Sequence, residues 1–72
     1  MEIIKLLLVE KLVQHTSMPV DEILLLKKSH INFEKKEITI LNELFFIEDK
    51  IVWDYLVRLS NSIPNSIYLF YF

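Results

Sequence analysis

The chain has 72 residues, a formal net charge of −2 and a hydrophobic content of 53%, and it contains neither cysteine nor glycine. This length allows one domain, and the hydrophobic content is high enough for a core and argues against disorder. The missing cysteine excludes disulfides and thiolate metal sites, and the missing glycine excludes glycine-rich phosphate loops and dinucleotide fingerprints.

Two helices are expected in the first part of the chain. Residues 2–15 carry apolar residues around most of a helix, so this helix is expected at the centre of the fold, contacted on more than one side. A second helix is expected over about 18–28, with Ser17 as N-cap and Pro19 in the first turn, where its missing N–H costs nothing. Glu22 adds negative charge near the positive end of the helix dipole.

A β-hairpin is expected next, with strands at 38–40 and 44–47. The residues between them, Asn42 and Glu43, lack a glycine at the position that needs positive φ, so a slightly longer or irregular loop is expected. The aromatic residues Phe45 and Phe46 are expected in the core.

Asp49 is expected to cap a third helix from Lys50 to about Ser60, with a buried stripe. The tail at 67–72, IYLFYF, is expected to be extended, and is either a covered strand or an association surface. The expected fold class is α+β: three helices with a small antiparallel β-hairpin. The buried stripe of the third helix consists of Val52, Leu56 and Leu59.

The run TSMPVDEILLLKKSHINF at 16–33 is followed by a charged turn, ITI, a hairpin, a helix and YLF. This order resembles the first half of the catalytic domain of the tyrosine recombinase (phage integrase) family, over roughly residues 6–70. Members carry a Thr-Gly-hydrophobic-Arg pattern followed by an acidic position. In this sequence the Thr, Gly, Arg and acidic positions hold Thr16, Ser17, Pro19 and Glu22. The resemblance implies a single truncated recombinase-like domain over 1–72, with an inherited role in DNA binding for DNA integration or site-specific recombination.

The catalytic groups of that family are missing. Pro19 stands in place of the arginine that binds the scissile phosphate, which leaves Glu22 without its partner. The hairpin lysine has no counterpart, and the family's His-x-x-Arg segment and nucleophilic tyrosine fall after the end of this chain. Phosphoryl transfer needs cations around the phosphate and a positioned nucleophile. We therefore expect no strand cleavage and assign no catalytic residue.

The lysines are the candidate contacts to DNA phosphates, which basic side chains can bind without sequence preference. The alternative is a solvated charge cluster balanced by Glu34 and Glu37. His15 and His30 have no cysteine or convergent acid at ligand spacing, so neither a metal site nor a cofactor is expected. The candidate DNA-binding residues are Lys27, Lys28, Lys35 and Lys36.

Two other functions stay open. The chain is either a protein-interaction module, whose apolar tail binds a full-length recombinase or a second copy, or a small winged-helix-like DNA-binding regulator. The regulator would read DNA with the helix at 18–28, which carries too little Arg, Asn or Gln to read bases well.

Neither a membrane nor a small-molecule substrate is expected as a partner. Every apolar run is far shorter than the roughly 20 residues that span a bilayer. The charged start of the chain does not resemble a signal peptide, so a cytoplasmic location is expected.

Overall fold

The computed structural model describes residues 2–70 of the chain, and the side chains of 3–70. The expected α+β class with three helices is confirmed, and the sheet has three antiparallel strands in the order β1-β2-β3, one more than the expected hairpin. The elements in chain order are α1 (Glu2–Thr16), α2 (Val20–Leu24), the 3-10 helix η1 (Lys28–His30), β1 (Ile31–Asn32), β2 (Glu37–Ile40), β3 (Glu43–Phe46) and α3 (Lys50–Ser62).

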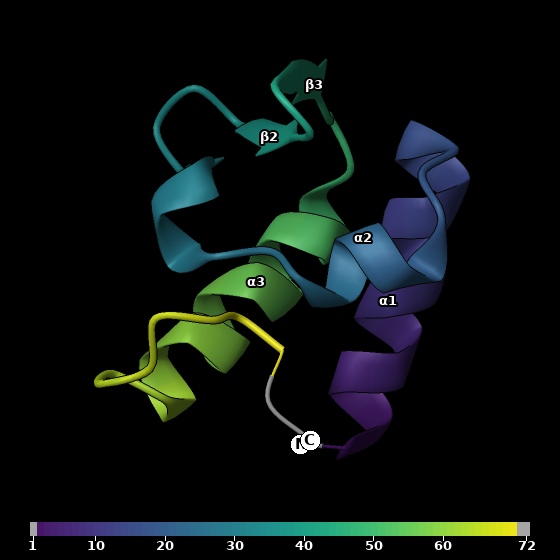
Figure 1. Cartoon of the computed structure of the whole chain (residues 1–72). Coiled ribbons are helices and arrows are strands. Elements are labelled where there is room, and N and C mark those ends of the chain that lie inside the picture. Colours follow the sequence, from purple (N-terminus) through teal and green to yellow (C-terminus); the bar gives the residue numbers. More distant parts are fainter. Residues whose placement is uncertain (1, 71–72) are drawn as a thin grey trace.

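The helices form one part of the fold and the sheet lies at one end of it (Figure 1). Helix α1 packs against both α2 and α3, and the inner face of the sheet closes the core between them. The fully buried side chains come from every part of the chain, which indicates a single core. They include Leu8, Leu12, Ile23, Ile38, Val52, Leu56, Leu59 and Leu69.

Helix α1 buries one side only. Leu8 and Leu12 are fully buried, whereas Ile3, Leu6 and Leu7 are exposed. The expectation that this helix is contacted on more than one side is therefore wrong for its first two turns. The physical reason is the size of the fold, because α2 and α3, which pack against α1, do not cover its whole surface.

The connection between α1 and α2 differs from the expected N-cap. Ser17 follows the last residue of α1, has φ 58°, and donates its N–H to Val13 O at 2.8 Å. This is the left-handed C-terminal motif of a helix, usually formed by glycine. Pro19 is the N-cap of α2 and makes no side-chain capping bond. Helix α2 ends at Leu24, earlier than expected, because the backbone is extended at Lys27, where it pairs with the C-terminal tail.

The hairpin loop has two residues, so the longer of the two expected loops is not found. Ile40 pairs with Glu43, so the loop consists of Leu41 and Asn42 alone. Both have positive φ, at 51° and 63°. Positive φ at both central residues is typical of the turn whose twist suits a two-residue hairpin. Phe46 lies on the outer face of the sheet and is exposed, so its expected place in the core is wrong.

The tail follows α3 and returns across the helical part of the fold (Figure 1). Lys28 N–H donates to Ile67 O at 2.9 Å, and Leu69 N–H donates to Leu26 O at 3.0 Å. Leu69 and Phe70 are buried. The covered alternative is thus confirmed for these two residues, and positions 71–72 lie outside the described part of the chain.

Candidate functional site

The segment that resembles the recombinase family forms the entrance to α2. Thr16 is buried, donates its hydroxyl to Leu12 O at 2.7 Å and accepts the N–H of Met18 at 3.2 Å. These bonds hold the chain as it leaves α1. Pro19 is exposed at the start of α2, and its carbonyl accepts the N–H of Glu22 at 3.1 Å. The position that resembles the family's arginine is therefore at a helix start, on the surface, and carries an apolar ring.

Glu22 is half-buried in the first turn of α2. It lines a surface hollow of about 270 Å³ between α2 and the β2–β3 hairpin, together with Leu25, His30, Thr39 and Asn42. Neither arginine nor lysine lines this hollow. The hollow thus offers a carboxylate and hydrogen-bonding groups, but neither a guanidinium nor an ammonium group for a phosphate.

The side chains of the four candidate lysines lie in three different surroundings. Lys27 Nζ lies 5.8 Å from the centre of the Tyr68 ring, a cation–π contact. Lys28 Nζ donates to the carbonyls of Ser60, at 3.1 Å, and Ile63. Lys35 and Lys36 are exposed in the turn between β1 and β2. Lys27 and Lys28 therefore have partners within the fold, whereas the side chains of Lys35 and Lys36 are presented to solvent.

Lys28 has a role that the sequence did not reveal. The carbonyls at the end of a helix lack intrahelical donors and form the negative end of its dipole. The ammonium group of Lys28 meets this end of α3 at Ser60 and Ile63. The lysine and its acceptors are more than 30 residues apart, so no local pattern could have predicted this contact.

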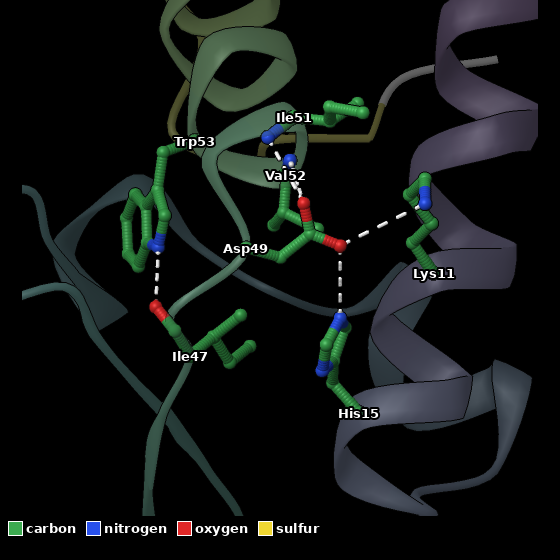
Figure 2. Close-up of polar contacts among 7 residues, drawn as sticks. All are labelled: Lys11, His15, Ile47, Asp49, Ile51, Val52 and Trp53. Atoms are coloured by element: carbon green, nitrogen blue, oxygen red, sulfur yellow. Dashed lines mark hydrogen bonds and ion pairs between the residues drawn. The ribbon is translucent and has the colours of Figure 1, made fainter.

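A polar cluster joins α1 to the start of α3 (Figure 2). Asp49 Oδ1 accepts the N–H groups of Ile51 at 3.0 Å and Val52 at 3.4 Å, which confirms the expected cap. Its other oxygen lies 3.2 Å from His15 Nε2 and 3.7 Å from Lys11 Nζ. One carboxylate therefore caps one helix and links it to another.

Electrostatics at this cluster favour the ionised carboxylate. The hydrogen bond from His15 lowers the pKa of Asp49 below its ordinary value, although desolvation opposes the shift. The amide donors of Ile51 and Val52 and the charge of Lys11 lower this pKa further. Of the two histidines considered as metal ligands, His15 contacts Asp49, and His30 Nδ1 accepts the N–H of Lys27 at 3.4 Å. Among the described residues no group of three side chains is arranged to hold a metal ion.

The aromatic residues support the core. Trp53 is buried, and its Nε1–H donates to Ile47 O at 2.7 Å (Figure 2). Phe33 meets the Trp53 ring edge-on, with centroids 5.8 Å apart. Trp53 therefore belongs to the core. Tyr55 is half-buried against the core, and the chain's single arginine, Arg58, is exposed on α3.

No helix among residues 2–70 has both the length and the apolar character to cross a membrane. Comparisons with protein-family models, curated proteins and solved structures find no match to the chain.

Proposed function

We propose that this chain is a non-catalytic relative of the first half of a tyrosine recombinase catalytic domain, and that it binds DNA in integration or recombination without cleaving it. The backbone at Ser17 carries this proposal. Ser17 stands at the position of the family's glycine and has φ 58°, a conformation that glycine adopts without steric cost. Pro19, at the position of the family's arginine, begins α2. The sheet and the cap of α3 then follow in the order that the resemblance implies.

The absence of strand cleavage is part of the proposal. The hollow beside Glu22 has no arginine or lysine to bind a scissile phosphate. Tyr55 is half-buried against the core, and Tyr68 faces Lys27. Neither of these tyrosines, the two within residues 2–70, has beside it a base or a set of anion-binding groups, which an attacking phenol needs. Purified chain is therefore expected to leave supercoiled plasmid DNA intact.

We assign DNA contact first to Lys35 and Lys36. Both are exposed in one tight turn, and Lys36 has φ 55°, whereas Lys27 and Lys28 have partners within the fold. Two phosphate contacts predict weak binding that depends on salt. With two cations released per complex, affinity should fall about tenfold between about 50 and 200 mM salt.

Fluorescence anisotropy with a labelled duplex tests this assignment. The double variant Lys35→Glu/Lys36→Glu should abolish binding at low salt. The double variant Lys50→Glu/Arg58→Glu is the matched control, because it changes charge by the same amount at exposed positions on α3. Absence of binding by the wild type at low salt, or an equal loss in the control, would contradict the proposal.

Protein association is a second candidate function, favoured by the exposed apolar side chains. A soluble monomer rarely exposes large contiguous apolar patches, and such patches mark interaction sites. Association through apolar contacts should persist in high salt, where DNA binding is lost. The winged-helix alternative gains no support from α2, which has five residues. The apolar residues more than half exposed are Ile3, Leu6, Leu25, Leu41, Leu44, Phe46 and Ile67.

A further inference from the structure

The third strand leaves one edge of the sheet open. In the order β1-β2-β3, strand β3 has a neighbour on one side only. An edge strand presents unpaired backbone N–H and C=O groups, which can pair with another strand.

The register identifies the groups that face the open edge. Ile47 N–H donates to Lys36 O, and bonded and non-bonded residue pairs alternate along an antiparallel ladder. Since Phe45 and Glu43 are two and four residues before Ile47, they also direct their N–H and C=O groups toward β2. Leu44 and Phe46 therefore direct theirs outward. The open edge offers four backbone groups from these two residues.

The same two residues expose apolar side chains. Leu44 is 59% exposed and Phe46 is 61% exposed, both on the outer face of the sheet. Monomeric proteins protect an open edge with lysine, proline or a β-bulge. The stretch 42–47, NELFFI, contains neither lysine nor proline, and β2 and β3 pair without a bulge. This edge has no lysine, proline or bulge, and its one charged residue is Glu43 at the start of the strand.

We propose that β3 pairs antiparallel with β3 of a second copy of this chain, about a two-fold axis at Phe45. In this register Leu44 lies opposite the partner's Phe46, and Phe46 lies opposite the partner's Leu44. Both are outward-facing residues, so each such pair forms two backbone hydrogen bonds. The two three-stranded sheets then become one continuous sheet, with four apolar side chains together on its outer face.

The charges fit a second copy. In this register Glu43 lies opposite the partner's Ile47, and Asn42 lies opposite the partner's Glu48. No acidic residue of 42–48 faces another, and an amide faces each Glu48 carboxylate. Like charges directly opposite each other would oppose pairing. A register shifted by two residues, with Leu44 opposite the partner's Leu44, would remove both Leu–Phe pairs.

Sedimentation velocity from micromolar to millimolar concentration tests the association. We expect a dimer that dissociates on dilution and persists in high salt. Leu44→Lys should raise its dissociation constant at least about tenfold, because it puts a charge opposite the partner's Phe46 in both pairs. Leu6→Lys is the matched control and should leave the constant unchanged, because Leu6 on α1 is similarly exposed, at 62%.

Disulfide formation tests the register without disturbing the core. The chain has no cysteine, so each variant carries a single thiol and a disulfide can form only at the introduced position. An equimolar mixture of the Leu44→Cys and Phe46→Cys chains should form a mixed disulfide faster than either chain forms a disulfide with itself. Equal rates in all three samples would overturn the register.

A wild-type chain that stays monomeric at millimolar concentration would overturn the proposal. So would a Leu6→Lys substitution that raises the dissociation constant as much as Leu44→Lys does. Capture of a labelled NELFFI peptide by the chain would support the pairing, because this peptide has the sequence of β3 and its neighbours at 42–47. The Lys35→Glu/Lys36→Glu chain should still dimerise. Failure of DNA binding and failure of strand pairing are therefore separate results.

Discussion

Replacement of Ser17 by glycine should stabilise this protein. Ser17 is exposed and has φ 58°. The left-handed conformation costs a residue with a Cβ about 1–2 kcal/mol. Glycine removes this cost but loses about 0.5–1 kcal/mol more conformational freedom on folding. The net expectation for Ser17→Gly is a gain of about 0.5–1 kcal/mol in the free energy of unfolding, or a Tm higher by about 4 °C for a domain of this size.

Urea unfolding followed by the fluorescence of Trp53 measures this change, because the chain has a single tryptophan and it is buried. Ser29→Gly is the matched control. Ser29 lies in η1 and is not among the residues with positive φ, so glycine there should lower stability by about 0.5–1 kcal/mol. If Ser17→Gly lowers stability as the control does, the backbone at Ser17 is not left-handed in solution. The support that this residue gives to the recombinase resemblance would then be lost.

Three further substitutions test other contacts. Trp53→Phe leaves the buried carbonyl of Ile47 without its donor and should cost about 1–3 kcal/mol in urea unfolding followed by circular dichroism; a loss below about 0.5 kcal/mol would refute this. Asp49 has a pKa lowered in the folded state. Its contribution to stability is therefore present above the unfolded-state pKa and is lost as the pH falls through the folded-state pKa. Between about pH 5 and pH 2 the wild type should lose more stability than Asp49→Asn; parallel pH curves would contradict this. Lys28→Met removes the donor to the end of α3 and should cost about 1 kcal/mol, whereas Lys35→Met should cost nothing measurable; equal effects would refute the role of Lys28.

The parts of the fold that depend on neighbouring residues were predictable. Asp49 is a good cap directly before an amphipathic run, and α3 begins at Lys50 as expected. The start of α2 next to Pro19 follows from local chemistry in the same way, because proline suits the entrance to a helix.

The parts that depend on distant residues were not predictable. The extended backbone at Lys27 pairs with Tyr68, more than 40 residues later. The contacts of Asp49 with His15 and of Lys28 with Ser60 join residues more than 30 positions apart. Leu41 takes positive φ although its own preference opposes it, because the paired strands on either side set the turn. Tertiary context overrode local preference at each of these positions.

The position of the tail has a consequence for biosynthesis. Leu69 and Phe70 enter the core only after α3 has been made, and Leu69 bonds to Leu26 in the first half of the chain. A ribosome-bound chain that has just completed α3 therefore still exposes the apolar surface that these residues later cover. The core is therefore completed only when residues 67–70 have left the exit tunnel. A stop codon or protease cut after residue 66 would remove Leu69 and Phe70 from the core and leave the apolar surface beneath them uncovered.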